Sequence, residues 1–345
     1  MLTHDSQPPR NILIIRLSSI GDIILTTPLI RAVHNKFPLA RIHYLIFQEY
    51  SQLVKYNPHI SKVVELPRVR GLAEYKYLGK VLRAQRYDMV IDLHSNLRSF
   101  LIKFYGGLNN SFMINKNYLK RWLLVCLKKN IYKTPYSVVN KYFKCVGGLE
   151  ITEDEKGNEL MIDNDTRIKV SRLLSEHNYK NKVIGIAPRS NWETKCWPLN
   201  NYTILAKDLL KEGFHIILFG TSSERSACEK IRQACLPEIW NTCGNLDLIS
   251  CAELIRKCNV LISNDSGPMH IASAVQTPVV AIFGNTCEEF GFYPYHCKSR
   301  VISLKMPCKP CHHIGRNKCP KNHFTCMEDI KPERVFGEVL KLLRN

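Results

Sequence analysis

Asn11-Ile12-Leu13-Ile14-Ile15-Arg16-Leu17-Ser18-Ser19-Ile20-Gly21-Asp22 passes from an apolar segment through a short loop into the start of a helix. We predict a buried strand over Asn11–Arg16 and an amphipathic helix over Asp22–Lys36. The loop holds a single glycine, so it is not the glycine-rich fingerprint of dinucleotide-binding domains. The stretch therefore predicts the first β-loop-α unit of a parallel α/β sheet.

Short apolar segments and amphipathic stretches of helical length alternate along the rest of the chain. Further strands are predicted in the first half at Ile42–Phe47, Lys62–Leu66, Asp88–Leu93 and Ser111–Ile114. In the second half they are predicted at Val183–Ala187, His215–Phe219, Val260–Ser263 and Val279–Phe283. This alternation indicates parallel sheets covered by helices on both faces.

A polar, acidic segment from Glu150 to Asp165 separates the two halves, and a chain of 345 residues is long enough for two cores. We therefore expect two Rossmann-like, doubly wound α/β domains facing a central cleft, at residues 1–165 and 166–345. The second domain includes a cysteine-rich segment at residues 308–326 and ends in a helix over Pro332–Leu343. Ligands of such sheets bind beyond the carboxyl ends of the strands.

The composition is that of a globular protein, with 45% hydrophobic and 23% charged residues. No apolar run approaches the roughly 20 residues of a membrane-spanning helix. The polar stretch Met1–Arg10 lacks the apolar core of a signal peptide, so we expect a cytoplasmic protein. In such a protein we expect most of the fourteen cysteines to be buried thiols rather than parts of a disulfide framework.

The net charge of +19 is unevenly distributed. Between Ser99 and Leu149 there are nine lysines and arginines and no acidic residue. An anionic membrane, a phosphorylated acceptor or nucleic acid would each favour such a surface, and a generally basic proteome is the plain alternative. No nucleic-acid-binding module accompanies the charge, so no nucleic-acid partner is expected. The portion Tyr118–Ile131 mixes Trp and Leu with Lys and Arg, as interfacial helices do, but an ordinary domain-covering helix fits equally well.

Ser19, Gly21 and Asp22 are candidate site residues at the end of the first strand. Gly21 permits a sharp turn or the close approach of a ligand. Asp22 is placed where a helix start stabilises a carboxylate, and a plain N-cap accounts for it as well. Such a carboxylate is a weak base. It can take a hydroxyl proton late, once an electron-poor sugar carbon draws on the attacking oxygen.

The second half contains three further candidate segments at strand ends. Asp265-Ser266-Gly267-Pro268-Met269-His270 predicts a turn into a helix whose first amides would bind a diphosphate, with Ser266 and His270 on one side. Lys195, beside Trp197, would neutralise a departing phosphate, and Glu224 would accept hydrogen bonds from ribose hydroxyls. A satisfied buried histidine, a solvated loop lysine and a solvated helix-start glutamate are the respective alternatives.

Together these segments resemble the ADP-heptose:lipopolysaccharide heptosyltransferases of glycosyltransferase family nine, from about Asn11 to Leu343. The family's S-x-G-D, K-x-W-P and D-[ST]-G-x-x-H elements match Ser19–Asp22, Lys195–Pro198 and Asp265–His270, and its glutamate after a G-x-x-x turn matches Glu224. Its acceptor-contacting D-x-Q-x-x-x-[KR]-S pattern matches Asp92–Ser99, which makes Arg98 a candidate for an acceptor phosphate or carboxylate. This chain has His94 where glutamine is usual.

The resemblance implies a GT-B fold and inverting transfer of L-glycero-D-manno-heptose from ADP-heptose to the inner core of lipopolysaccharide. Asp22 would be the catalytic base, and Ser19, Gly21 and Arg98 would lie at the acceptor. Lys195 would also stabilise the leaving ADP, and the donor would be bound by Lys195, Glu224, Asp265, Ser266, Gly267 and His270. The partners would be ADP-heptose, the lipid A and core oligosaccharide acceptor, and the anionic inner face of the inner membrane, where the enzyme would be peripheral. The final helix would pack back onto the first domain, as is frequent in GT-B proteins.

Three other functions are compatible with parts of the sequence. The same scaffold could use another nucleotide-sugar or acceptor. A dehydrogenase is disfavoured because the chain lacks G-x-G-x-x-G with an acidic residue about 20 positions later. A non-enzymatic binder of anionic polymers would account for the charge alone. The sequence does not distinguish which heptose is added, and it does not indicate an oligomeric state.

Cys308, Cys311, Cys319 and Cys326 form a cluster in the sequence near the C-terminus. Four such thiolates could hold a structural zinc ion or an iron–sulfur cluster, and free thiols are the alternative. The transfer reaction is expected to require no cofactor, because Lys195 and a helix N-terminus supply the positive charge.

Overall fold

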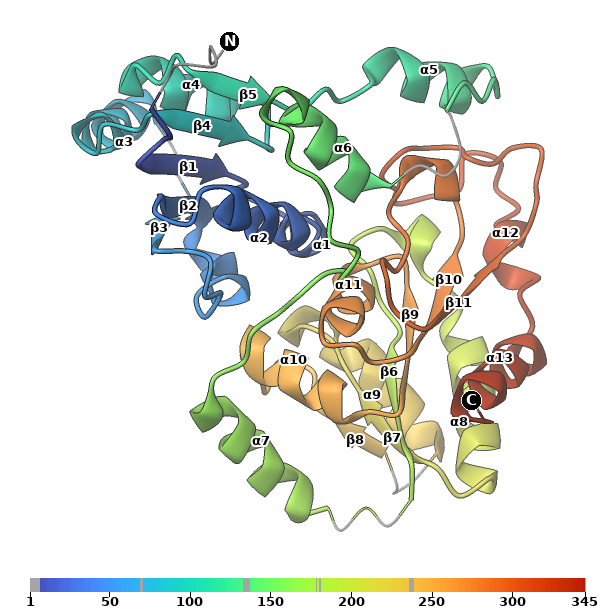
Figure 1. Ribbon diagram of the computed structural model, residues 1–345. Coiled ribbons are helices and arrows are strands. Elements are labelled where there is room, and N and C mark those ends of the chain that lie inside the picture. Colours follow the sequence, from blue (N-terminus) through green and yellow to red (C-terminus); the bar gives the residue numbers. More distant parts are fainter. Residues whose placement is uncertain are drawn as a thin grey trace. The chain divides into compact units, whose positions relative to one another are not determined.

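The computed structural model describes residues 7–68, 71–132, 137–177, 179, 181–235 and 239–344. It divides into two compact α/β units (Figure 1). The first comprises the chain up to Asn117 together with Val138–Met161, and the second comprises Tyr118–Ser137 and the chain from Ile162 onward. We predicted one boundary after residue 165; the contacts divide the chain slightly earlier and assign Tyr118–Ser137 to the second unit.

The first unit is built on a parallel sheet of order β3-β2-β1-β4-β5. Its strands are β1 Asn11–Ile15, β2 Arg41–Phe47, β3 Lys62–Leu66, β4 Met89–Asp92 and β5 Ser111–Met113. The central strands are buried on both faces, which accounts for their continuous apolar runs. Strand β1 pairs with both β2 and β4, so the loops that follow β1 and β4 emerge side by side.

The helices of the first unit are α1 Ile20–Ile24, α2 Thr27–Lys36, α3 Leu72–Ala84, α4 Leu97–Gly106 and α6 Val138–Cys145, with short 3-10 turns at Gln48–Leu53 and Gly147–Leu149. The single helix predicted over Asp22–Lys36 is wrong in one respect, because α1 ends at Ile24 and α2 begins at Thr27. Pro28 occupies the first turn of α2, and a proline there cannot continue the preceding helix. Helices α3 and α4 pack so closely that a Cβ on Gly79 would lie 2.6 Å from the backbone of Tyr105.

The second unit contains a six-stranded parallel sheet of order β11-β10-β9-β6-β7-β8. Its strands are β6 Val183–Ala187, β7 His215–Leu218, β8 Ile239–Asn241, β9 Val260–Asn264, β10 Val279–Phe283 and β11 Ser299–Ser303. The two edge strands, β8 and β11, were not predicted. Strand β8 has three residues and only Ile302 of β11 is buried, so neither gives a clear apolar signal in the sequence.

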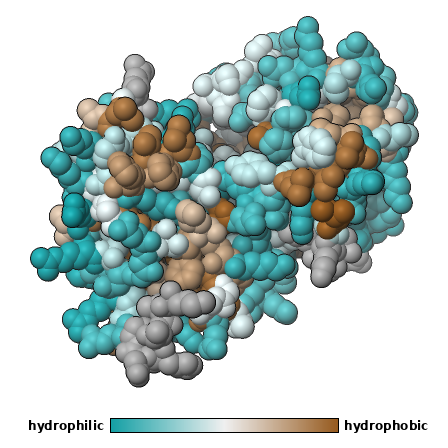
Figure 2. Space-filling model, turned by 90° about the horizontal axis from the view of Figure 1, so that it is seen from above, coloured by the Kyte–Doolittle hydropathy of each residue, from teal (hydrophilic) through white to brown (hydrophobic). Residues whose placement is uncertain are grey.

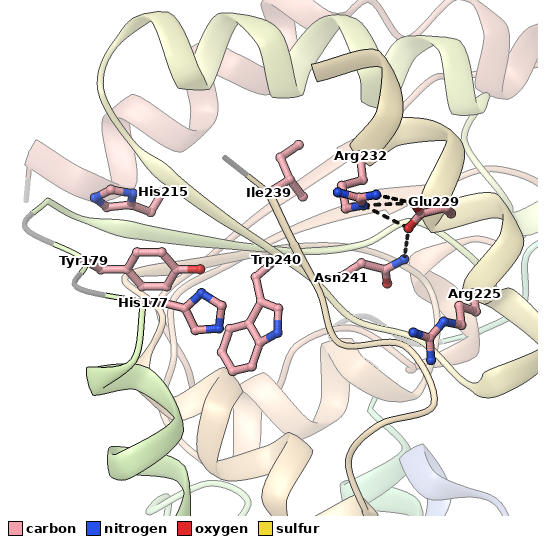
Figure 3. Close-up of a pocket in the computed structure, with 9 residues that line it drawn as sticks. All are labelled: His177, Tyr179, His215, Arg225, Glu229, Arg232, Ile239, Trp240 and Asn241. Atoms are coloured by element: carbon pink, nitrogen blue, oxygen red, sulfur yellow. Dashed lines mark hydrogen bonds and ion pairs between the residues drawn. The ribbon is translucent and has the colours of Figure 1, made fainter. Parts of the chain in front are cut away.

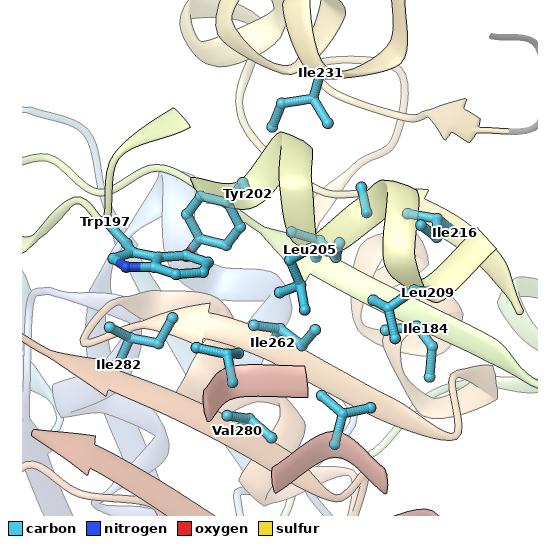
Figure 4. Packing of buried hydrophobic residues seen from close by; sticks show 14 of the residues in the cluster. Ile184, Trp197, Tyr202, Leu205, Leu209, Ile216, Ile231, Ile262, Val280 and Ile282 are labelled. Carbon is cyan, nitrogen blue, oxygen red and sulfur yellow. The ribbon is translucent and has the colours of Figure 1, made fainter. Parts of the chain in front are cut away.

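The helices of the second unit are α5 Tyr118–Cys126, α7 Asn164–Ser175, α8 Leu199–Lys211, α9 Arg225–Cys235, α10 Leu248–Lys257, α11 Gly267–Ala274, α12 Thr325–Glu328 and α13 Pro332–Arg344, with 3-10 turns at Glu193–Lys195, Ser222–Glu224 and Glu288–Phe290. Trp197, Tyr202 and Leu205 pack onto the sheet residues Ile262 and Ile282 (Figure 4). The final helix, α13, packs against α8 and buries its apolar residues in this core. Its predicted contact with the first domain stays a prediction. None of the described helices is both long and apolar enough to cross a membrane.

Candidate active site

The loop after β1 places Asp22 in the first turn of α1. Ser19 is the N-cap of this helix and Asp22 is its third residue, in a reciprocal capping box, so the N-cap position considered for Asp22 is wrong by three residues. Oγ of Ser19 donates to Oδ2 of Asp22 over 2.9 Å. Gly21 lies within α1, and its φ is not positive. This position therefore does not require glycine for a left-handed turn.

Arg16 connects this loop with the loop after β4. Its Nη2 lies 2.6 Å from Oδ1 of Asp22, its Nε donates to the carbonyl of Ser18 over 2.8 Å, and its Nη1 donates to the carbonyl of Leu93. Burial lowers the pKa of Arg16, but Asp22 together with Tyr142 and Tyr44 outweighs that effect, so the pKa is raised and the guanidinium stays charged. Arg16 is not among the predicted site residues, because an arginine at the end of an apolar strand belongs to no recognisable motif.

The loop after β4 is organised by the side chains of Asp92 and Asn96. Asp92 accepts the backbone N–H groups of His94 and Ser95 and forms an ion pair of 3.0 Å with the buried Lys103. Asn96 caps α4, with its Oδ1 accepting from the Ser99 N–H. These bonds fix the direction in which α4 leaves the sheet.

His94 and Arg98 lie on this loop in different environments. Nε2 of the buried His94 is 2.8 Å from Nδ2 of Asn96, and its Nδ1 has no hydrogen-bond partner in the described structure. Oδ1 of Asn96 accepts from Ser99, so the group that faces His94 is the Nδ2 amide, which donates. Nε2 of His94 is therefore the acceptor, and the proton of the neutral imidazole lies on Nδ1. Burial, helped by Arg16, lowers the pKa of His94 to about 4. Arg98 is exposed, with its guanidinium 5.6 Å from the centre of the Phe47 ring.

In the second unit two predicted residues meet at the carboxyl ends of the strands. Nζ of Lys195 lies 2.7 Å from Oδ2 of Asp265, and both side chains are nearly buried. Thr286, in the loop after β10, donates to the same oxygen over 2.7 Å. Motifs separated by about 70 residues in the sequence thus form one ion pair. Asp265 is occupied in holding Lys195, which argues against direct contact between this carboxylate and a phosphate.

Asn264 joins the loop that carries Lys195 to the start of α11. Its Oδ1 accepts from the Trp197 N–H and its Nδ2 donates to the carbonyl of Pro188. Helix α11 begins at Gly267 with Ser266 as N-cap and Pro268 in the first turn, as predicted. The first amides of a helix have no acceptor inside it, so this end is suited to an anion. His270 is buried one turn further on.

Glu224 closes the turn after β7. Its Oε2 accepts from the Thr221 N–H and hydroxyl over 2.7 and 3.0 Å, in a second reciprocal capping box. Burial lowers the pKa of Arg189, but the nearby Cys196, Glu193 and Glu224 together outweigh it and raise the pKa on balance. Sequence reasoning missed Arg189, although it stands in the loop after β6. It also missed Asn285 in the loop after β10, whose buried amide has no partner in the described structure and which no motif marks.

A cavity of about 640 Å³ lies elsewhere in the second unit, along the β8 edge (Figure 3). The His177 and Trp240 rings are tilted toward each other with centroids 4.0 Å apart, and the Tyr179 and His215 rings are stacked with centroids 4.5 Å apart. Arg232 is paired with Glu229, which also accepts from Asn241. None of the motif residues lines this cavity, so the sequence motifs and this cavity do not coincide.

The metal site expected at the cysteine-rich segment is not supported. In the part of the chain that the structure describes, no three His, Cys, Asp or Glu side chains form a group that could hold a metal ion. Cys326 is buried in the core cluster of the second unit, and Sγ of Cys308 contacts Nε2 of His323 at 3.6 Å. The segment is instead linked to α5, because Nζ of Lys128 donates to the carbonyls of Cys308 and Pro310.

Two parallel α/β units, with a lysine beside a helix N-terminus at the strand ends of the second, have the architecture of the GT-B class of glycosyltransferases. The sequence profile of glycosyltransferase family 9 (heptosyltransferase) matches residues 76–321. The chain belongs to this family.

Relatives of known name agree with this assignment. The chain is 30% identical over 321 residues to lipooligosaccharide heptosyltransferase 2 of Haemophilus influenzae, covering 85% of this chain and 88% of that protein. It is 27% identical to lipopolysaccharide heptosyltransferase 2 of Escherichia coli, over 96% of this chain and 98% of the relative. A crystal structure of a family 9 glycosyltransferase from Veillonella parvula shares the fold with a TM-score of 0.82 at 21% identity, covering 97% of each chain.

Proposed function

We propose that this protein transfers L-glycero-D-manno-heptose from ADP-heptose to a hydroxyl of the lipopolysaccharide inner core. The observation that carries the proposal is the Lys195–Asp265 ion pair beside the α11 N-terminus, in a chain whose relatives are named heptosyltransferases. A fixed cation next to free helix amides fits the diphosphate of a nucleotide-sugar.

The second unit binds the donor in this proposal. Lys195 and the first amides of α11 at Ser266 and Gly267 stabilise the negative charge that develops on ADP as it leaves. Asp265 acts through Lys195, because its carboxylate holds the ammonium group in place. Glu224 accepts hydrogen bonds from ribose, and His270 lines the diphosphate site. The positive charge comes from the protein itself, so the transfer step that we propose needs no cofactor.

The first unit supplies the base. The acceptor hydroxyl attacks the anomeric carbon from the face opposite ADP, so a new C–O bond forms while the bond to the β-phosphate oxygen breaks. The electron pair of the broken bond leaves with ADP, the hydroxyl proton passes to Asp22, and the configuration inverts. Ser19 and Arg16 hold the carboxylate of Asp22, and Arg98 meets an anionic group of the acceptor.

We propose a peripheral position on the anionic inner face of the inner membrane. Helix α5 supports this, because Tyr118, Leu119 and Trp122 are exposed on a helix that also carries Lys120 and Arg121. Figure 2 shows apolar surface gathered over α5. Aromatic and basic side chains on one short helix are typical of interfacial binding.

Mass spectrometry of acceptor lipid after incubation with ADP-heptose tests the proposal. Acceptors truncated before the first, second and third heptose are each incubated with the wild type and with an Asp22→Asn variant. A gain of one heptose on one acceptor, absent with the variant, is expected. Transfer of a different sugar from a panel of ADP- and UDP-sugars, with none from ADP-heptose, would overturn the donor assignment.

A further inference from the structure

Helix α4 is apolar on its outward side as well as on its inward side. Ser99, Ile102 and Gly106 are buried against the first unit. Leu97, Phe100 and Phe104 point away from it and are 71%, 58% and 67% exposed. These three positions are spaced i, i+3 and i+7, so they form one stripe along the helix. We call them the α4 outer face.

A helix that is apolar all round is normally buried, which makes an exposed apolar stripe a candidate contact surface. The rings of Phe100 and Phe104 are stacked with centroids 6.2 Å apart, so the stripe is continuous. Figure 2 shows apolar surface gathered over α4. Met113, at the end of the neighbouring strand β5, adds a further exposed apolar side chain.

The surroundings of the α4 outer face are cationic. Helix α3 packs along α4 and exposes Lys76, Lys80 and Arg83 against one acidic residue, Glu74, and α4 itself exposes Arg98. No acidic residue occurs from Leu93 to Leu149. Exposed aromatic residues bordered by cations complement a bilayer surface of anionic lipid, in which rings lie at headgroup depth and each cation gains from the surface potential.

The position of α4 connects this surface to the proposed acceptor site. The helix begins at the Asn96 cap, directly after the loop that contains His94, and Arg16 bonds the carbonyl of Leu93 as well as Asp22. The start of the α4 outer face therefore follows directly after the loop that Arg16 joins to Asp22.

We propose that the α4 outer face inserts into the headgroup region of an anionic bilayer and presents the lipid-anchored acceptor to the first unit. The inference rests on the proposed function for the identity of the acceptor, but not for the lipid contact itself. It differs from the role given to α5, which belongs to the second unit.

The test uses the full chain with Phe100→Gln and Phe104→Gln combined, since glutamine keeps helix propensity while removing the rings. Ile168→Gln is the matched control, because Ile168 is also 58% exposed but lies on α7 in the second unit. Binding is measured on vesicles of phosphatidylglycerol and phosphatidylcholine in equal parts. Transfer is measured with acceptor embedded in those vesicles and with delipidated core oligosaccharide in solution.

The double variant is expected to lose at least about tenfold in vesicle affinity and to raise the apparent KM for embedded acceptor similarly. Its kcat/KM with the soluble oligosaccharide should equal that of the wild type and of the control. Unchanged vesicle binding overturns the inference, as does an equal loss with the soluble acceptor. A wild-type dimer that the double variant converts to monomer would assign the face to a second copy instead. If the wild type transfers no heptose, the proposed function is wrong. The lipid contact is then still tested by vesicle binding alone.

Discussion

Nη2 of Arg16 lies 2.6 Å from Oδ1 of Asp22, and the same guanidinium bonds the carbonyl of Leu93 in the neighbouring loop. One buried cation thus holds the carboxylate and joins it to the segment that precedes α4. A carboxylate held in this way is anionic and oriented before any acceptor arrives, which suits late proton transfer.

The first prediction concerns Asp22 itself. Asp22→Asn keeps the size and the capping position but cannot take a proton, so kcat should fall by roughly 10²–10⁴. Binding of ADP, followed by calorimetry, should be unchanged because the residues proposed to bind the donor lie in the second unit. Glu65→Gln, at an exposed position on β3, is the control for charge loss in the same unit. Near-native transfer by Asp22→Asn would remove Asp22 as the base.

Arg16 gives a separate prediction about positioning. Arg16→Lys retains a charge but lacks the planar guanidinium whose three nitrogens each bond a different acceptor, and Arg16→Met retains neither the charge nor the donors. We expect kcat to fall by about 100-fold in Arg16→Met and by less in Arg16→Lys, with the KM for ADP-heptose unaltered. Steady-state kinetics with both substrates varied measures this. Equal kcat values for the wild type and Arg16→Met would show that the ion pair has no role in turnover.

The third prediction concerns the departing phosphate. Lys195→Met removes the cation that Asp265 holds in place, so kcat should fall by at least about 100-fold, as when one donor to a developing oxyanion is lost. ADP affinity should also weaken. Lys305→Met, at an exposed position in the same unit, controls for the loss of one positive charge. If both variants bind ADP and turn over like the wild type, Lys195 does not contact the leaving group.

The sequence was sufficient for the two parallel sheets and for the strand ends that carry the candidate residues. Apolar runs such as Val279–Phe283 are unambiguous because both faces of the strand are buried. The break between α1 and α2 was missed because the apolar periodicity continues across it. The partners of the site residues could not be predicted either. Lys195 meets Asp265, and Arg16 meets Leu93, only because distant strands are neighbours in the sheets.

His94 predicts how the first unit responds to acid. Burial chiefly lowers its pKa to about 4 from an ordinary value near 6.5. The unfolded chain therefore takes up a proton between these two pH values that the folded chain refuses, so stability is lost as the pH falls through this window. The full pKa shift corresponds to a loss of at most about 3 kcal/mol in the free energy of unfolding. His94→Gln should reduce the loss of stability between pH 7 and pH 4.5, measured by urea unfolding, whereas the exposed His296→Gln should not. An unchanged acid response in His94→Gln would contradict the buried neutral imidazole.

The cysteine-rich segment gives the last prediction, which separates free thiols from a metal site. Burial raises the pKa of Cys319, but backbone hydrogen bonds from residues 321–324 outweigh it and lower the pKa on balance. Burial raises the pKa of Cys326 to about 11. Since the thiolate is the reactive form, iodoacetamide at neutral pH should modify Cys319 well before Cys326, as read by peptide mass spectrometry, with Cys319→Ser as the control. Four thiolates bound to one metal would all be protected until a chelator is added. Protection of all four cysteines, together with metal found by elemental analysis, would show that the segment binds a metal after all. Rapid modification of Cys319 without a chelator would show that its thiolate is free.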